Sequence, residues 1–273
     1  MKYCLPYIKN FKYMEELDEI IIPYQTEQDA EFLRAVLEFT ENKFNGTIII
    51  NIEDTTAFRE AGSMKFFEEL KSKKVLENFK LRFTAHYKEH EDLYKGLKAA
   101  EIPFFFEKYV KDWDAFDFFK KLGVSDMYIV ETLAFELDKI GAQADVSGIS
   151  IRCFANVCQS SVRDHNPLKS FFIRPEDVSI YEPYVDVIEF YGSLNIQEVM
   201  YKVYAKDKKW FGPLQEIIIG FEYDLDSRFI LPIYAKTRLK CGKRCLKGQR
   251  CSICEKVVSV AGTLEDKGVY VKA

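Results

Sequence analysis

Four cysteines near the end of the chain carry the clearest chemical signal in this sequence. From Lys240 to Cys254 the chain reads K-C-G-K-R-C-L-K-G-Q-R-C-S-I-C, which spaces the thiols of Cys241, Cys245, Cys251 and Cys254 as C-x3-C-x5-C-x2-C. Thiolates brought together by short loops form a closed four-sulfur site that suits Zn²⁺ or an iron–sulfur cluster. The sequence therefore predicts that these four cysteines bind a metal.

Two other interpretations of the cysteine cluster are free surface thiols and disulfides. Free cysteines are usually buried singly, whereas these four lie in a polar and basic stretch. Disulfides belong mainly to exported proteins, and the chain has an odd number of cysteines, seven. Both observations favour metal ligation. The spacing is short for a zinc ribbon and suits a compact cluster, which leaves both metals open.

Basic residues surround the cysteines, and no acidic residue lies between them. They can offset the negative charge of a thiolate-bound metal and remain solvated, or they can contact the phosphates of RNA or an anionic substrate. The seven residues are Lys236, Arg238, Lys240, Lys243, Arg244, Lys247 and Arg250.

Composition bounds the class of protein. The chain has 273 residues, 48% of them hydrophobic, which is ample for a core. Its net charge of −4 argues against nucleic-acid binding by bulk charge. Residues 1–19 contain no long apolar run or small-residue cleavage signal, and no later stretch approaches 18 apolar residues. We therefore expect a cytoplasmic protein without a membrane span.

Short β-rich runs alternate with amphipathic helical stretches along the chain. The pattern predicts strands at 18–24, 47–54, 81–87, 102–106, 126–130, 149–154 and 185–191, closed by 216–221 or 229–234. It predicts helices at 27–41, 64–76, 91–100, 113–122, 133–140 (ended by Gly141) and 196–205, and a short helix within 174–184. About eight strand–helix units favour a TIM-barrel-like (β/α)8 fold over an open sheet.

The pattern also predicts how the chain is divided. No G-x-G-x-x-G or P-loop follows a predicted strand, which weakens a nucleotide-binding open sheet. We expect a TIM-barrel-like domain over residues 1–235. A cysteine-rich metal-binding tail over residues 236–273 would pack on it.

In such a barrel the active site lies at the carboxyl ends of the strands. The residues there form a polar, acid-rich rim: Tyr24, Gln25, Glu53, Asp54, His86, Glu107, Glu131, Cys153, Asn156, Glu189 and Tyr191. Glu53, His86 and Glu189 are the catalytic candidates. Strand ends are exposed in any case, so acids there can be solvated or cap the next helix, and His86 can be structural.

A second cysteine pair, Cys153 and Cys158, follows the strand predicted at 149–154. The segment S-I-R-C-F at Ser150–Phe154, with F-F-I-R-P-E-D-V-S-I-Y-E-P-Y-V-D-V-I-E-F-Y-G at Phe171–Gly192, resembles the collagenase-like peptidase (U32) superfamily. The resemblance is closest to its UbiU/UbiV branch and covers about residues 145–192.

The resemblance implies a TIM-barrel-like fold and a cysteine-bound [4Fe–4S] cluster, with Cys153 and Cys158 as cofactor ligands. The family's further cysteines between Cys158 and Phe171 are absent, so the tail can supply the missing thiols or carry its own site. Members act in O2-independent hydroxylation of ubiquinone precursors or of tRNA uridine, and others are described as peptidases. On this resemblance we favour [4Fe–4S] over Zn²⁺.

The leading hypothesis is an iron–sulfur enzyme that modifies an RNA base or a small aromatic molecule. The first alternative is a zinc-stabilised, non-catalytic barrel that binds nucleic acid or a protein partner. The second is a peptidase, although no Ser-His-Asp order or H-E-x-x-H motif is present.

Overall fold

The fold is taken from a computed structural model of the whole chain. The residues that it describes are 1–7, 11–24, 44–60, 63–72, 78–130, 133–158, 170–221, 223–230, 233–239, 241 and 270–272. Several sequence predictions lie outside these residues: the helix at 27–41, and Gln25, Glu131, Cys245, Cys251 and Cys254.

Within the described residues, nine strands form one sheet in which every neighbouring pair is parallel. The strands are β1 (Lys2–Pro6), β2 (Glu19–Tyr24), β3 (Thr47–Ile52), β4 (Phe79–Phe83), β5 (Phe104–Phe106), β6 (Tyr109–Val110), β7 (Asp126–Ile129), β8 (Ser150–Phe154) and β9 (Val187–Glu189). Their order is β5-β4-β3-β2-β1-β9-β8-β7-β6. Isoleucine runs in β2 and β3 are buried, as expected for a sheet covered on both faces.

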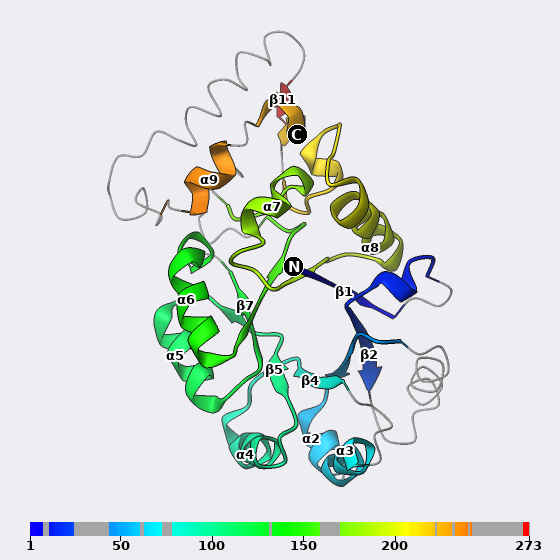
Figure 1. Cartoon of the computed structure of the whole chain (residues 1–273), viewed down its shortest axis with the longest axis vertical. Helices are drawn as coiled ribbons and strands as arrows, with labels where there is room; N and C mark the ends of the chain where they lie inside the picture. Colours follow the sequence, from blue (N-terminus) through cyan, green and yellow to red (C-terminus); the bar gives the residue numbers. More distant parts are fainter. Residues whose placement is uncertain are drawn as a thin grey trace.

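The sheet curls until its two ends meet. β4 and β7 each lie next to an end strand, yet Lys80 of β4 donates to Asp126 of β7 at 2.8 Å. At the seam itself, the backbone N–H of Ser125 donates to the carbonyl oxygen of Phe104 at 2.8 Å. The result is the TIM-barrel-like α/β fold that the alternating pattern predicted (Figure 1).

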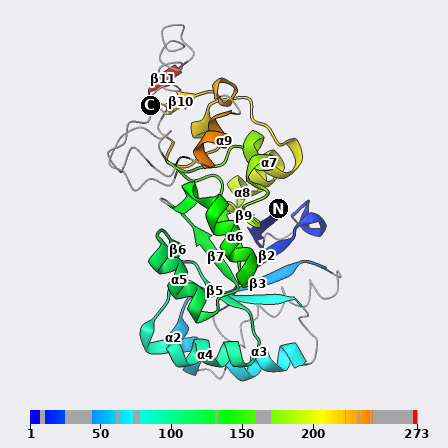
Figure 2. The same cartoon turned by 60° about the vertical axis from the view of Figure 1, so that its left-hand side comes forward.

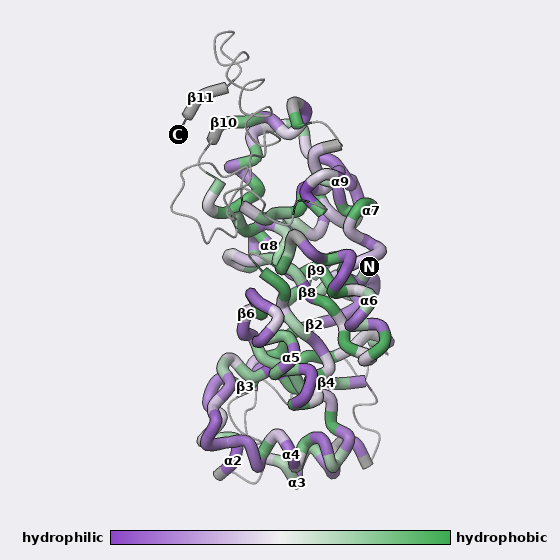
Figure 3. The backbone as a smooth tube through the Cα atoms, turned by 90° about the vertical axis from the view of Figure 1, so that its left-hand side faces the viewer, coloured by the Kyte–Doolittle hydropathy of each residue, from purple (hydrophilic) through white to green (hydrophobic). Residues whose placement is uncertain are grey.

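Helices surround the strands. They are α2 (Thr55–Glu60), α3 (Ser63–Ser72), α4 (Glu91–Ala99), α5 (Trp113–Leu122), α6 (Leu137–Ser147), α7 (Val178–Tyr181), α8 (Leu194–Tyr201), which a π-helix at Lys202–Asp207 extends, and α9 (Ile233–Leu239). Short 3-10 turns lie at Met14–Glu16, Lys88–His90, Leu133–Phe135, Pro175–Asp177, Leu214–Glu216 and Ser227–Phe229. Figure 3 shows mostly hydrophilic colour along α2 and α4.

Capping residues explain where two of the helices lie. Asp112 accepts the backbone N–H of Ala115 at the start of α5, and Gly123 ends that helix with a φ of 83°. The prediction that a helix ends at Gly141 is wrong. The helix α6 passes through Gly141 and runs to Ser147. Gly148 caps it with a φ of 65°, a left-handed conformation that glycine adopts without strain.

The first and last strands of the barrel also differ from the prediction. β1 at Lys2–Pro6 lies between β2 and β9, although K-Y-C-L-P shows no marked strand pattern. The described residues of the two stretches predicted to close the barrel do not join the sheet. Residues 216–221 form turns with one bridge from Ile219 to Val157; in the second stretch, Phe229 ends a 3-10 turn and Ile233 begins α9. Backbone pairing with two neighbouring strands therefore makes β1 a strand despite its weak local preference.

Beyond the barrel, α9 and a short two-stranded sheet lie at the same end of the molecule as α7, away from α3 (Figure 2). In that sheet β10 (Tyr223–Leu225) pairs antiparallel with β11 (Tyr270–Lys272). In the part of the chain that the structure describes, no helix is long and apolar enough to span a membrane.

Candidate active site at the barrel mouth

Charged side chains lie inside the barrel, towards the amino ends of its strands. Arg152 donates to Glu19 at 2.6 Å and to Asp126 at 2.9 Å, and its guanidinium lies 4.9 Å from the ring centre of Phe105. Lys80 donates to both carboxylate oxygens of Asp126, at 2.9 and 2.8 Å. We call Glu19, Lys80, Asp126 and Arg152 the lower network. Because its members come from four strands, this network joins opposite sides of the barrel.

Burial and charge act in opposite directions on the lower network. Burial raises the pKa of Asp126, but the charges of Arg152 and Lys80 outweigh it, so the pKa of Asp126 ends below its usual value. The carboxylate is therefore held in its ionised form and balances the two cations. The lower network supports the next layer of side chains towards the carboxyl ends of the strands, where the barrel opens into a cavity.

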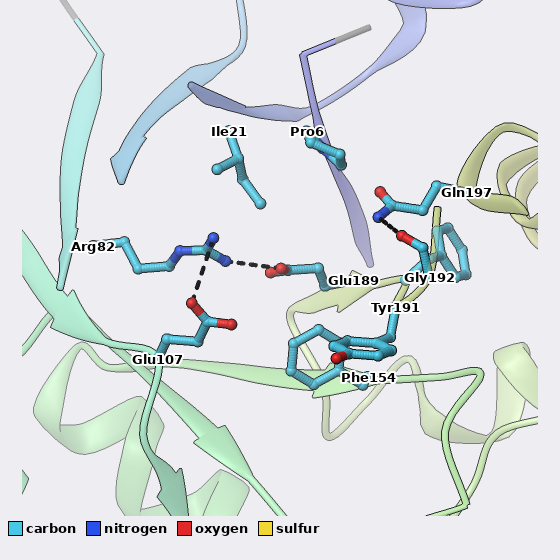
Figure 4. A pocket seen from close by; sticks show the side chains of 10 residues that line it. Pro6, Ile21, Arg82, Glu107, Phe154, Glu189, Tyr191, Gly192 and Gln197 are labelled. Atoms are coloured by element: carbon cyan, nitrogen blue, oxygen red, sulfur yellow. Dashed lines mark hydrogen bonds and ion pairs between the residues drawn. The ribbon is translucent and has the colours of Figure 1, made fainter. Parts of the chain in front are cut away.

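The cavity has a volume of about 330 Å³ and lies at the carboxyl ends of the strands (Figure 4). Pro6, Phe154 and Glu189 line it, and these residues end β1, β8 and β9. The other lining residues are Ile21, Arg82, Glu107, Phe190, Tyr191, Gly192 and Gln197. The position is the one at which barrel enzymes place their chemistry.

Arg82 and Glu189 form the floor of the cavity as a tightly held pair. The Nη1 atom of Arg82 donates to Glu189 Oε1 at 2.8 Å, and its Nε atom donates to Asn51 at 2.8 Å. The hydroxyl of Tyr128 donates to the other oxygen of Glu189 at 2.5 Å. Both carboxylate oxygens of Glu189 are thus engaged, so this residue is fixed in place as an acceptor.

Glu107 is held much more loosely than Glu189. Its nearest charged partner is the Nη2 atom of Arg82, at 3.6 Å, and 31% of its side chain is exposed. Burial raises its pKa, Arg82 lowers it, and the charges of Glu189 and Glu53 raise it, with a raised pKa as the net result. A carboxyl group with a raised pKa and free oxygens in a cleft is suited to take up or release a proton.

Aromatic rings form one wall of the cavity. Phe154 stacks on Tyr128 with ring centres 5.1 Å apart, and Tyr191 meets Phe154 edge-on at 6.1 Å. Two hydrogen bonds of 2.8 Å between the side chain of Asn156 and the backbone of Tyr191 fix the loop that carries this ring. Such a wall can stack against a flat ligand and keep water from one of its faces.

The structure brings only part of the predicted rim into the cavity. Glu189 lines it, whereas Glu53, which directly follows β3 and is exposed, is not among the lining residues, although its charge raises the pKa of Glu107. Asp54 caps α2 by accepting the backbone N–H groups of Thr56 and Ala57, as the alternative interpretation predicted. The catalytic role of Glu53 stays a prediction.

The catalytic candidates derived from the sequence omit Arg82 and Glu107. Glu107 directly follows β5, so its place among the strand-end residues was a sufficient signal. Arg82 is a charged residue inside the buried strand β4, which reads F-K-L-R-F. A charge at such a position must find a buried partner, and that requirement was the available signal.

His86 lies outside the cavity lining. β4 ends at Phe83, so His86 follows in the loop, and its ring packs against Tyr94, Phe106 and Phe118 at centre distances of 5.1–5.4 Å. Among the described residues its buried Nε2 atom has no hydrogen-bond partner. These contacts favour the structural alternative, and catalysis by His86 stays a prediction.

We expect acid to destabilise the protein through His86. Burial lowers its pKa most, followed by the charge of Lys108; Glu91 raises it, Lys88 lowers it and Glu89 raises it, and the net result is a lowered pKa. The unfolded chain, with a pKa of 6.5, therefore binds the proton more readily, so stability should fall as the pH drops below 6.5.

Replacing His86 by phenylalanine should flatten this part of the stability profile, because phenylalanine keeps the ring contacts and binds no proton. Urea unfolding at about pH 7.5 and about pH 5.5 would test this for both proteins. An equal loss of stability on acidification in both would contradict it.

The described cysteines lie in two kinds of surroundings. Cys153 is fully buried on the face of β8 opposite Arg152; its thiol lies 3.6 Å from the carbonyl oxygen of Ile129, and burial raises its pKa. Cys158 and Cys241 are half-buried and pack against the core. The described residues contain no group of three or more His, Cys, Asp or Glu side chains that could hold a metal. Ligation by any of these cysteines stays a prediction.

Arg238 is one of the seven basic residues around the cysteine motif, and the structure buries it. It is 4% exposed, donates to Tyr234 at 2.8 Å, and also bonds the carbonyl oxygen of Ser170. Arg238 therefore attaches α9 to the barrel and does not face solvent, where phosphate would bind.

Known proteins give little further guidance. No protein-family model matches the chain, and no curated protein is similar to it in sequence. A solved structure of a U32 peptidase is similar with a TM-score of 0.44 and 10% identity, over 71% of this chain and 93% of its own. An L-ribulose 3-epimerase is similar with a TM-score of 0.35 and 11% identity, over 85% of this chain and 88% of its own.

Proposed function

We propose that this chain is an iron–sulfur enzyme whose barrel mouth binds a small planar substrate, either an RNA base or a free aromatic molecule. The observation that carries the proposal is the pairing of a fixed and a loose carboxylate, Glu189 and Glu107, around Arg82 in a cavity with an aromatic wall. This arrangement provides binding and proton transfer at the place where barrel enzymes perform chemistry.

Each lining residue has a role that follows from its contacts. Arg82, held by Asn51 and Glu189, keeps the floor of the cavity rigid and places its one positive charge between the carboxylates of Glu189 and Glu107. Glu107 takes up or releases a proton at its carboxylate oxygens. Phe154 and Tyr191 stack on the substrate and exclude water from it.

The tail supplies a donor set that fits a metal cluster. Four thiols are the ligands that a [4Fe–4S] cluster requires, and the same set would hold Zn²⁺. The described part of the tail supports a fixed position for the first of them: Arg238 donates to the carbonyl oxygen of Ser170, outside α9, and the backbone N–H of Cys241 donates to the carbonyl oxygen of Arg238 at 3.0 Å. A bound cluster would supply one-electron chemistry.

Protein purified without oxygen should contain iron and absorb light broadly at about 400 nm. Replacing Cys245 or Cys254 by serine should remove most of this iron, because a serine hydroxyl is a much weaker ligand than a thiolate. The matched control is Ser252→Ala, which lies inside the same motif and should keep full iron content. Iron would be quantified per chain by elemental analysis.

Other outcomes would decide between the alternatives. Zinc in place of iron, with loss of folding on Cys→Ser change, would support the zinc-stabilised, non-catalytic barrel. A sample with neither iron nor absorbance near about 400 nm would contradict the cluster.

A further inference from the structure

The side chain of Gln197 has an unused acceptor at the cavity. Gln197 is the fourth residue of α8 and is 8% exposed. Its amide nitrogen donates to the carbonyl oxygen of Gly192 at 2.8 Å. That bond fixes which way the amide points. Its Oε1 atom is buried and has no hydrogen-bond partner among the described residues. A buried amide oxygen without a donor costs free energy, so its position indicates a ligand that donates to it.

The cavity offers a ligand more hydrogen-bond acceptors than donors. The donors of Arg82 already face Asn51, Tyr128, Glu189 and, at 3.6 Å, Glu107. Beyond this 3.6 Å contact of its Oε2 atom with Arg82, the described residues give the carboxylate of Glu107 no other ion pair. A ligand entering the cavity therefore meets a loose carboxylate and an unused amide oxygen but few free N–H groups.

The shape of the cavity limits the ligand further. Figure 4 shows the rings of Phe154 and Tyr191 together on one side of the cavity, in the lower part of the view, with the Arg82–Glu189 pair and Gln197 drawn above them. The volume of about 330 Å³ is at the lower end of the range for small-molecule sites, about 300–1,000 Å³. A flat ring of modest size would stack on this wall and present its edge to the acceptors.

We infer that the cavity binds a flat ring that carries N–H donors and is neutral or cationic, such as an amidine or an amino-substituted heterocycle, and discriminates against a carboxylate of the same shape. The inference rests on the proposal that this cavity is the substrate site and names the class of substrate it takes. Glu107 would accept from one edge donor and Gln197 Oε1 from another, and the ring would lie on Phe154 and Tyr191.

Benzamidine and benzoate test this inference, because they have nearly the same shape and opposite charge. Binding of each to the full-length protein would be measured by isothermal titration calorimetry at about pH 7.5. We expect benzamidine to bind at least about tenfold more tightly than benzoate, since the bound amidinium would form charge-assisted hydrogen bonds. Equal or tighter binding of benzoate, or no detectable binding of benzamidine, would overturn the inference.

Variants locate the binding. Glu107→Gln keeps the shape of a partly exposed side chain and should weaken benzamidine about tenfold to a hundredfold. Gln197→Leu should weaken it as well, and circular dichroism would verify that both variants are folded. The matched control is Glu216→Gln, the same change at an exposed position outside the cavity, and it should leave the affinity unchanged. Equal weakening by the control, or none by Glu107→Gln, would place the ligand elsewhere and refute the assignment.

This experiment separates the inference from the proposed function. Iron bound by the tail together with preference for benzoate would leave the cluster intact and refute the ligand class. Preference for benzamidine in a protein without a metal would support the ligand class and refute the cluster, because the titration depends on the cavity alone.

Discussion

Replacing Arg152 by methionine is expected to lower the free energy of unfolding by about 3–5 kcal/mol. Arg152 is fully buried and provides the short contacts to Glu19 and Asp126 in the lower network. Methionine fills a similar volume but leaves two buried carboxylates with Lys80 as their remaining cation. Folded proteins are stable by only about 5–15 kcal/mol, so this loss would be a large fraction of the total.

Chemical unfolding followed by far-ultraviolet circular dichroism would measure the effect of the Arg152 change. Arg228→Met is the matched control, because that arginine is exposed and its ion pair with Asp226 lies at the surface, and it should leave the unfolding midpoint nearly unchanged. Adding Glu19→Gln to Arg152→Met should restore part of the loss, since one unpaired buried charge is then removed. Equal midpoints for wild type and Arg152→Met would refute the supporting role of the lower network.

Replacing Arg174 by methionine should also destabilise the protein, by about 3–5 kcal/mol, and should loosen the approach to the tail. Arg174 is 2% exposed; it donates to both oxygens of Asp177, at 2.6 and 2.8 Å, and to the carbonyl oxygens of Ser227 and Ile230, each at 2.9 Å. It thereby joins the start of α7 to the chain segment that leads into α9. Methionine would remove the donor from both oxygens of Asp177 and from the carbonyl oxygen of Ile230, whereas the carbonyl oxygen of Ser227 keeps the backbone N–H of Ile230, at 3.1 Å.

Two measurements distinguish general destabilisation by Arg174→Met from a local effect on the tail. Chemical unfolding gives the global loss, and limited proteolysis under native conditions reports whether the chain around 223–239 becomes accessible first. If the tail binds metal, this variant should lose it at milder conditions than Arg152→Met does. Uniform proteolysis at unchanged stability would contradict the anchoring role of Arg174.

Local patterns in the sequence determined most of the barrel. The isoleucine runs of β2 and β3, the capping pair Asp112 and Gly123 around α5, and the regular alternation of strands and helices depend on neighbours within a few residues. The spacing of the four tail cysteines is local in the same sense. A prediction from the sequence alone is therefore possible for these features.

The site depends on contacts between residues far apart in the chain, and only the tertiary structure decided it. In S-I-R-C-F the alternation of β8 puts Arg152 and Cys153 on opposite faces, but it does not say which face is the interior of the barrel. In the structure Arg152 points into the barrel, because it pairs there with Glu19 and Asp126. Cys153 therefore points to the outer side of the sheet, where its thiol contacts the carbonyl oxygen of Ile129. Likewise, Glu107 and Glu189 become unequal only through Arg82 and Tyr128, which hold one carboxylate firmly and the other loosely.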